Sequence, residues 1–356
     1  MRRTALVTGG AGFVGINVAD RLLREGRHVR VLDNLSRPGV ERNLRWLEAE
    51  HGRLLEVELA DVRDREGVAR AMRGVSEVLH FAAQVAVTTS IDEPERDAAV
   101  NLQGTLNVLE EARLASSPPA VLFTSTNKVY GGLDGVRLVE RGTRHVAADA
   151  ALHAGVSEDH PLSFCTPYGC SKGAADQYVL DYGQTYGIPT VVMRMSCIYG
   201  QHQCGNEDQG WVAHFLMCAM EDLPITIYGD GKQVRDVLFV EDLVEAMLRA
   251  LERIDRVGGR AFNIGGGRDN SVSLVEMMSM IAELIGREPK VEHGEWRQGD
   301  QLWYVSDTSR FESATGWHAR TPPDKGLERM HAWLASRARD EEPELELEAT
   351  PLLGRA

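Results

Sequence analysis

The sequence predicts an α/β protein built on a doubly wound parallel sheet, with a smaller C-terminal substrate-binding lobe. Three observations support this fold class. Strand-like apolar runs alternate with amphipathic helices over the first 200 residues. A glycine-rich turn joins the first strand to the first helix. Small or polar residues then follow each later strand, at the sheet edge where such folds bind ligands.

The first strand covers Thr4 to Thr8 and leads into a G-x-x-G-x-x-G turn at Gly9, Gly12 and Gly15. A helix follows to about Glu25. Glycines at this place allow a tight turn and let the backbone approach a pyrophosphate, which then faces the helix N-terminus. We therefore predict a Rossmann-type dinucleotide site, with the cofactor beside four residues of the turn: Gly9, Gly12, Phe13 and Val14.

The second strand, residues 28–32, ends at Asp33, about 20 residues beyond the turn, where an acid hydrogen-bonds the adenosine ribose. An acid there repels the 2′-phosphate of NADP, so the expected cofactor is NAD. Arg37 lies close enough to leave NADP open, and Asp33 as an ordinary turn residue is the alternative. We expect Asn34, Ser36 and Arg37 beside the same end of the cofactor.

Two further strands, 54–57 and 75–81, each end in candidate cofactor residues. After the third strand, Asp61 either contacts adenine, with Val62 beside it, or caps the helix that begins near Asp64. After the fourth, small side chains let a cofactor lie against the strand end, which adds Ala82, Ala83 and Gln84 to the predicted site.

A long helix is predicted over residues 94–114. Its apolar stripe recurs at helical spacing, which favours a core or dimer face over a ligand site: Ala98, Leu102, Leu106, Leu109 and Ala112. Asn101, on this helix, is placed near the cofactor, with a structural role favoured over a catalytic one.

The strand at 120–123 leads through Thr124, placed at the cofactor, to Thr126. A helix that begins near Tyr168 carries Lys172 one turn later, and both of these side chains are also placed at the cofactor. An i, i+4 spacing puts the phenol and the ammonium on one helix face. An ammonium near a phenol favours the phenolate, which can take a proton from a sugar hydroxyl. A lone Y-x-x-x-K pair is often two surface residues, so the cofactor motif supplies the necessary context.

The remaining chain divides less regularly. A long loop at 132–167 shows little periodicity, and a strand at 188–193 is followed by Met195, placed at the cofactor, and Ser196, placed at the substrate. We expect a cofactor domain at 1–200, to which 232–260 returns, and a substrate lobe from 201–231 and 261–335. Residues 339–356 hold six acids and two arginines and are expected to form a mobile tail.

Composition excludes several classes of protein. The chain has 356 residues, 43% hydrophobic and 26% charged, with a net charge of -14 and a pI near 5.3. That balance argues against a nucleic-acid partner. No apolar run reaches the roughly 18 residues of a membrane span, and no signal-peptide pattern opens the chain. Five scattered cysteines show no metal-binding spacing, so we expect free thiols, no metal and a cytoplasmic location.

With these residues identified, the chain resembles the nucleotide-sugar epimerases of the extended short-chain dehydrogenase/reductase family, over about residues 3–334. Five segments are most similar to the CDP-sugar 2-epimerases of that family: residues 84–92, 125–131, 167–178, 208–211 and 231–238. The segment 201–207 differs from the corresponding segment of those enzymes and is expected to line the substrate cleft. The acidic tail is also not part of their pattern.

The resemblance implies a tightly held NAD and inversion at C2 of a nucleotide-diphosphate sugar through a 2-keto intermediate. It implies Thr126, Tyr168 and Lys172 as the catalytic residues. It also implies a homodimer or homotetramer, joined through the helices near 94–114 and 168–186. The substrate contacts that it implies are Thr88, Thr126, Asn127, Ser196, Gln209, Gly210, Arg235 and Arg297; for the two arginines, which would bind the diphosphate, a surface salt bridge is the alternative.

Dehydration is disfavoured, because the family's 4,6-dehydratases need an Asp-Glu pair where this chain has Asn127 and Lys128. Two alternatives stay open: a UDP-sugar 4-epimerase with the same catalytic residues, and a non-catalytic NAD-binding regulator, which would commonly lack Tyr168 or Lys172. The nucleotide base, the sugar, the choice between dimer and tetramer and the role of the tail stay open as well.

Overall fold

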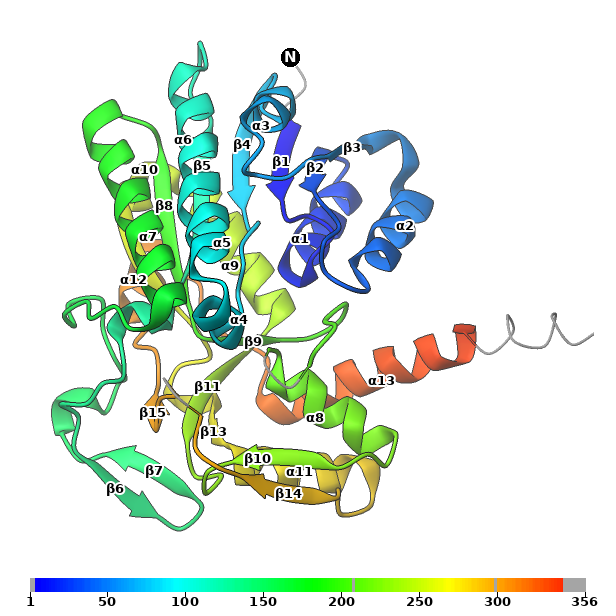
Figure 1. Cartoon of the computed structure of the whole chain (residues 1–356), viewed down its shortest axis with the longest axis vertical. Coiled ribbons are helices and arrows are strands. Elements are labelled where there is room, and N and C mark those ends of the chain that lie inside the picture. The colour runs from blue at the N-terminus through cyan, green and yellow to red at the C-terminus, as the bar shows by residue number, and fades with distance from the viewer. Residues whose placement is uncertain (1–3, 207–208, 298–299, 342–356) are drawn as a thin grey trace, which may run out of the picture.

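The computed structural model describes residues 4–206, 209–297 and 300–341, and it confirms the predicted fold class. A parallel sheet of seven strands lies above a smaller lobe (Figure 1). Its order is β12-β8-β5-β4-β1-β2-β3. The strands are β1 (Thr4–Thr8), β2 (His28–Asp33), β3 (Leu55–Leu59), β4 (Val75–His80), β5 (Ala120–Thr126), β8 (Thr190–Met195) and β12 (Arg260–Ile264). The order reverses between β1 and β4, which opens the crevice where such folds bind nucleotides.

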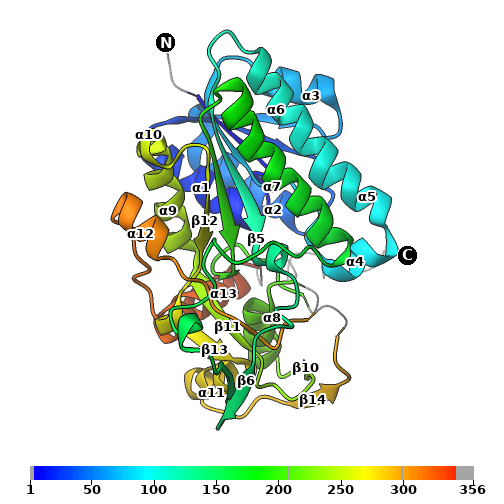
Figure 2. The same ribbon diagram turned by 90° about the vertical axis from the view of Figure 1, so that its left-hand side faces the viewer.

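Helices cover both faces of this sheet. On one face, α1 (Phe13–Arg24), α2 (Val40–His51) and α9 (Val240–Glu252) enclose a core that includes Ile16, Leu47 and Met247. The other face carries α3 (Arg65–Ala71), α6 (Gly104–Leu114) and α7 (Thr166–Tyr186), with a second core around Val108 and Val179. Figure 2 shows α6 and α7 side by side on that face.

The helix expected over residues 94–114 consists of three pieces. After α4 (Val87–Asp92), α5 (Pro94–Ala98) passes into a π-helical segment (Ala99–Gln103) and then into α6. Of the predicted apolar stripe, Leu109 and Ala112 are buried in the core, whereas Ala98 is exposed. π-helical turns are rare, and those that occur are frequently at functional sites. This turn therefore points to a functional role for the segment around Asn101.

The smaller lobe is built around a four-stranded sheet of β9 (Cys197–Tyr199), β11 (Val234–Phe239), β13 (Ser271–Ser273) and β15 (Trp303–Tyr304). A parallel pair, β10 (Ile225–Tyr228) and β14 (Val291–Gly294), lies beside it. Its helices are α8 (Trp211–Met220), α11 (Leu274–Ile285) and α13 (Pro323–Glu341). A separate apolar core, with Phe215, Met277 and Met330, holds these elements together.

The structure differs from the expected lobe boundaries in three places. β11, expected to return to the large sheet, pairs with β9, β13 and β15, and only α9 after it packs on α1. β12, expected in the smaller lobe, is an edge strand of the large sheet, because Phe262 and Ile264 pack in its core. α12 (Ser309–Thr315) also packs there, through Phe311, which stacks edge-on against Phe262. The short helix α10 (Ile254–Val257) precedes β12.

Two segments expected to be irregular contain regular structure. The long loop forms a hairpin of β6 (Leu138–Arg141) and β7 (Arg144–Ala147), which Lys232 ties to the smaller lobe through an ion pair with Glu140. The expected tail begins inside α13, which reaches Glu341, and residues 342–356 lie outside the described part of the chain. No helix among the described residues is long and apolar enough to cross a membrane.

Candidate active site

The glycine turn lies between the ends of β1 and β4 and leaves no room for side chains. Gly9 has a φ of +66°, and a Cβ there would lie 2.7 Å from the backbone nitrogen of Ala82. A Cβ on Gly15 would lie 2.2 Å from the Gly9 carbonyl oxygen. These two close approaches explain the glycines, and they let the backbone at Gly12 and Phe13 face a pyrophosphate directly.

Asp33 holds the neighbouring loop in place. Its carboxylate accepts hydrogen bonds from the backbone N–H groups of Ala11, at 3.0 Å, and Leu35, at 2.9 Å. Burial raises the pKa of Asp33, while these hydrogen bonds and the Arg37 guanidinium act to lower it. Asp33 thus links the glycine turn to the loop that carries Asn34, Ser36 and Arg37.

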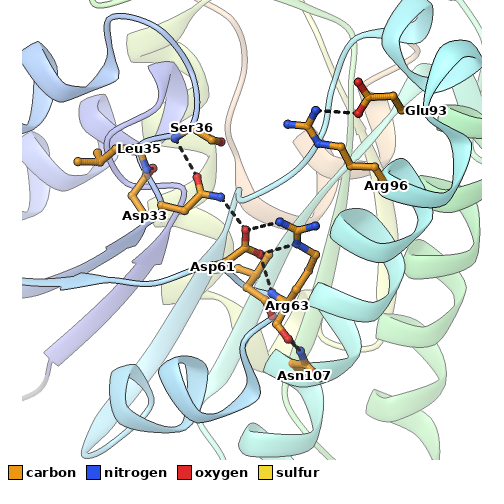
Figure 3. A network of polar contacts seen from close by, with 10 residues as sticks. Asp33, Leu35, Ser36, Asp61, Arg63, Glu93, Arg96 and Asn107 are labelled. Atoms are coloured by element: carbon orange, nitrogen blue, oxygen red, sulfur yellow. Dashed lines mark hydrogen bonds and ion pairs between the residues drawn. The ribbon is translucent and has the colours of Figure 1, made fainter.

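Asp61 forms a second polar group at this edge (Figure 3). It accepts hydrogen bonds from the Arg63 guanidinium and from the Asn34 amide, at 2.8 Å, and the Arg63 bonds lower its pKa to about 2. Asp64, three residues later, is the residue that caps α3. The capping alternative for Asp61 is therefore wrong, and Asp61 and Asn34 lie together beside Asp33, on the adenosine side of the crevice.

Beneath the end of β4 lies a buried polar network that the sequence interpretation missed. Asp97, on α5, accepts hydrogen bonds from the Ser171 hydroxyl, from the Asn101 amide at 3.1 Å and from the Gln84 amide at 3.0 Å. Asn101 also donates to Ser171 and accepts from the Gln84 backbone. The preference for a structural role of Asn101 fits these bonds, and its predicted place near the cofactor stays a prediction. Asp97 gives no distinctive sequence pattern, because a single acid near a helix start usually acts as a cap.

The three predicted catalytic residues come together at the end of β5. Thr126 hydrogen-bonds the Tyr168 hydroxyl, and both side chains are more than nine-tenths buried. Lys172, one turn later on α7, is 4% exposed, and its ammonium lies 4.1 Å from the centre of the Phe123 ring. Thr124, also assigned to the cofactor site, is buried and donates to the His80 carbonyl. A phenol, a hydroxyl and an ammonium therefore share one dry site.

We expected the pKa of Tyr168 to be lowered, but the groups of the protein itself raise it. Burial raises the pKa of Tyr168 to about 12, and the nearby Asp97 carboxylate adds to that rise. Burial also lowers the pKa of Lys172 to about 7. The expectation fails because burial has the largest effect on the pKa of this phenol, and the side chains that also act on it are Thr126 and Asp97, not Lys172. A positive charge that enters the site would lower the pKa of Tyr168 and so favour the phenolate.

Asp97 therefore has a predicted effect on the pH dependence of turnover. Because its charge raises the pKa of Tyr168, Asp97→Asn should lower that pKa. We expect the rising limb of the kcat–pH profile, which reports ionisation of the phenol, to move to lower pH with KM little changed. Measuring both constants across the pH range checks this. A profile that drops uniformly, with its limbs in place, would show a purely structural role.

Two of the predicted substrate residues, Arg235 and Asn127, lie in one group of polar side chains with Lys128, Asp300 and Gln301. Arg235 is buried and donates to the Asp300 carboxylate at 2.6 Å. Lys128 lies 4.0 Å from the same carboxylate, and burial together with Arg235 lowers its pKa. Asn127 donates to Gln301, which in turn donates to the Gly131 carbonyl. Asp300 and Gln301 belong to this group and were not assigned a role from the sequence.

The other predicted substrate residues lie in separate parts of the structure. Arg297 stacks on the Tyr228 ring at 3.8 Å, and Thr88 is exposed on α4. The Ser196 hydroxyl binds the buried Asp236 carboxylate. Gln209 lines a cavity together with Gly12 and Arg37, on the cofactor side, and Gly210 begins α8. The neighbouring residues 207, 208, 298 and 299 lie outside the described residues.

These residues fit a bound NAD. The glycine turn offers bare backbone for the pyrophosphate, Asp33 and Asp61 lie on the adenosine side, and Ala82 and Ala83 leave space at the end of β4. Val14 and Met195 are partly buried beside the same core, and Val62 is buried beneath α6. Tyr168 and Lys172 then lie at the far end of the crevice, where the nicotinamide belongs.

Comparison with known proteins agrees with this geometry. Residues 5–265 match the family described as the NAD dependent epimerase/dehydratase family. The chain is 40% identical over 338 residues to CDP-paratose 2-epimerase of Salmonella typhi, covering 93% of this chain and 99% of that protein. It is 32% identical over 323 residues to UDP-glucose 4-epimerase of Mycolicibacterium smegmatis, covering 90% and 95%.

Solved structures give the same result. UDP-glucose 4-epimerase of Thermus thermophilus, crystallised with NAD, superposes with a TM-score of 0.78 at 32% identity, over 93% of this chain and 99% of that one. The Thermotoga maritima UDP-glucose 4-epimerase, crystallised with UDP-glucose, gives 0.81 at 29% identity, over 94% and 99%. With this fold, this cofactor site and these relatives, the chain belongs to the NAD dependent epimerase/dehydratase family, as an NAD-dependent nucleotide-sugar epimerase.

Proposed function

We propose that this epimerase inverts C2 of a CDP-linked sugar through a 2-keto intermediate. The observation that carries the proposal is the buried cluster of Tyr168, Thr126 and Lys172 at the end of β5, next to a dinucleotide site. The choice of C2 and of CDP is supported by the 40% identity to a CDP-paratose 2-epimerase over nearly the whole chain.

Residues of the chain itself take up and return the proton of the sugar hydroxyl. Tyr168, as phenolate, takes the proton of the C2 hydroxyl, and Thr126 hydrogen-bonds the same sugar oxygen. The Lys172 ammonium stabilises the phenolate and binds the nicotinamide ribose. Bound NAD, which the glycine turn and Asp33 would hold, would supply a hydride acceptor for C2 and then a hydride donor for the opposite face of the 2-keto sugar. Tyr168 then gives the proton back to the oxygen, so no acid–base group is needed at carbon.

Basic side chains hold the diphosphate while the keto sugar turns over. Among the described residues, Arg235 and Lys128 both lie beside the Asp300 carboxylate, so two cations are close enough together to share a diphosphate. Guanidinium groups bind phosphate oxygens in bidentate fashion, which suits Arg235 and Arg297. A diphosphate fixed there leaves the sugar ring as the part that rotates.

The same wall speaks against dehydration. That reaction needs carboxylates to move protons at two further sugar carbons, and the residues after Thr126 are Asn127 and Lys128. In the structure, the Asn127 amide donates a hydrogen bond to Gln301, and Lys128 is a partly buried cation. An amide and an ammonium cannot replace an acid–base carboxylate pair.

A second candidate function is 4-epimerisation of a UDP-sugar. It is favoured by a relative that carries that name at 32% identity and by two solved UDP-glucose 4-epimerases with TM-scores of 0.78 and 0.81. The catalytic residues would be the same, and only the hydroxyl that faces Tyr168 would differ. A non-catalytic regulator is not favoured, because Tyr168 and Lys172 are both present and buried together.

A panel of substrates separates these functions. The purified protein is incubated with CDP-, GDP- and UDP-hexoses, and the products are identified by NMR. We expect a C2 epimer from a CDP-hexose. A C4 epimer formed from a UDP-hexose, with no reaction of the CDP-sugars, would replace the proposal by its alternative.

We also propose that the chain is a cytoplasmic homo-oligomer. All five cysteines are free thiols, as expected in a reducing compartment. Several large apolar side chains are exposed on α6 and α7, where the resemblance places the subunit interface: Leu114, Tyr178 and Tyr186. Sedimentation analysis, which would separate a dimer from a tetramer, tests this interface.

A further inference from the structure

The segment Gln201–Cys204, which we call the strap, crosses from the end of β9 toward the cofactor crevice. The sequence comparison singled this segment out as a departure from the related 2-epimerases and placed it at the substrate. In the structure it contacts the helices that surround the glycine turn. The strap contacts α1 and α2 of the cofactor lobe and α13 of the smaller lobe.

Two asparagines tie down the backbone of the strap. The Asn17 amide, on α1, donates to the Gln201 carbonyl at 3.0 Å. The Asn43 amide, on α2, donates to the His202 carbonyl at 3.3 Å and to the Ala11 carbonyl, within the glycine turn, at 3.1 Å. Asn43 therefore joins the strap directly to the turn that faces the pyrophosphate.

An aromatic stack fixes the middle of the strap. The His202 ring lies between Trp46 of α2, with ring centres 4.4 Å apart, and Trp333 of α13, at 5.1 Å. His202 has a φ of +63°, a backbone conformation that a histidine rarely adopts unless its surroundings enforce it. Figure 1 shows α13 passing below α2, so the stack connects the smaller lobe to the cofactor lobe.

Under the strap lies a cavity of about 60 Å³ that faces the cofactor turn. Gly12, Phe13 and Arg37 line one side of it, and Gln203 lines the other. Gln203 is 8% exposed and donates its amide N–H to the Ile198 carbonyl, but its amide oxygen has no hydrogen-bond partner among the described residues. A buried acceptor without a donor is costly, so this oxygen points to a ligand that carries a hydroxyl.

We propose that the strap is a cofactor-retaining element, which closes the crevice over the pyrophosphate and ribose of NAD, with the Gln203 amide oxygen accepting from a ribose hydroxyl. A ligand on the glycine turn can leave only when the strap separates from α1, α2 and α13. The strap thus keeps one NAD bound through the oxidation and the reduction of each turnover. This role is independent of which sugar carbon reacts.

Trp333→Ala tests the proposal, because Trp333 contacts the strap from outside and does not line the cavity. The protein is loaded with radiolabelled NAD, and release is timed in excess unlabelled NAD. Loss of one aromatic contact corresponds to about a tenfold faster release. Asn17→Ala, which removes the bond to Gln201, should also speed release, and Gln203→Leu should weaken NAD binding with the strap contacts intact.

The matched control is Trp296→Ala, the same substitution at an exposed tryptophan of the smaller lobe that packs on Gly229. It should leave the NAD release rate unchanged. Unfolding midpoints of the NAD-free variants show that each is folded. Wild-type release rates in folded Trp333→Ala and Asn17→Ala proteins, or equal acceleration in Trp296→Ala, would overturn the proposal.

Discussion

Tyr168→Phe should lower kcat by about 1,000-fold while the protein remains folded and keeps its NAD. A loss of kcat of this size is typical when a positioned acid–base group is removed. The substitution removes one hydroxyl, which Thr126 hydrogen-bonds in a site that is almost fully buried. Without this hydroxyl the neighbouring Thr126 offers the sugar oxygen only a neutral alcohol, which is a poor proton acceptor.

Tyr182→Phe is the matched control for this variant. Tyr182 lies on the same helix, has the same 8% exposure and donates its hydroxyl to Glu110 at 2.8 Å. It should cost comparable stability and leave kcat unchanged. The measurement is turnover of the sugar-nucleotide substrate together with the NAD content of each protein. Equal turnover in Tyr168→Phe, with NAD bound, would remove Tyr168 from the mechanism.

Lys172→Met should lower kcat by about 100-fold or more, the loss that follows removal of one charge at the reacting centre. The ammonium is the positive charge of the chain closest to the phenol on its own helix face, and it stays buried against Phe123. Methionine keeps the length and the apolar stem. Lys232→Met, at a lysine that pairs with Glu140 on the surface, serves as the control and should turn over normally.

The same variant has an effect on stability with a defined sign. Lys172 has a pKa of about 7 in the folded protein, against 10.5 for an ordinary lysine. Between these values the unfolded chain binds more protons, so stability rises with pH across that window, and the cost of burying the charge is complete below about pH 7. NAD-free Lys172→Met should therefore unfold at a higher temperature than wild type at pH 7, and the difference should shrink toward pH 10. A difference that grows with pH would contradict the burial of a charged Lys172.

The parts of the fold that the sequence predicted are those with short-range signals. The glycine turn, the acid at Asp33 and the spacing of Tyr168 and Lys172 each lie within one strand–turn–helix unit, so their geometry follows from local rules. The lobe boundary did not follow, because β12 joins the large sheet through Phe262 and Ile264, whose partners include Phe311, far along the chain.

The sequence placed Thr126, Tyr168 and Lys172 at one site, and the structure brings these residues together, but the pKa of Tyr168 differs from the expectation. An i, i+4 spacing places a phenol and an ammonium on one face, but it carries no information on how dry that face is. The burial that raises the Tyr168 pKa, and the Asp97 carboxylate beneath it, arise from contacts between α5 and α7. The contacts of the strap have the same long-range origin, since Trp46 and Trp333 meet His202 only in the folded chain, and its expected place at the substrate stays a prediction.

The most direct test of the account follows the hydrogen at C2. A CDP-hexose that carries deuterium at C2 is converted in ordinary water, and the product is examined by NMR and mass spectrometry. The account predicts a C2-inverted sugar that keeps its deuterium, because hydride leaves and returns within one closed site. Loss of the label to water would show that a carbon-bound proton is removed, and would contradict the mechanism.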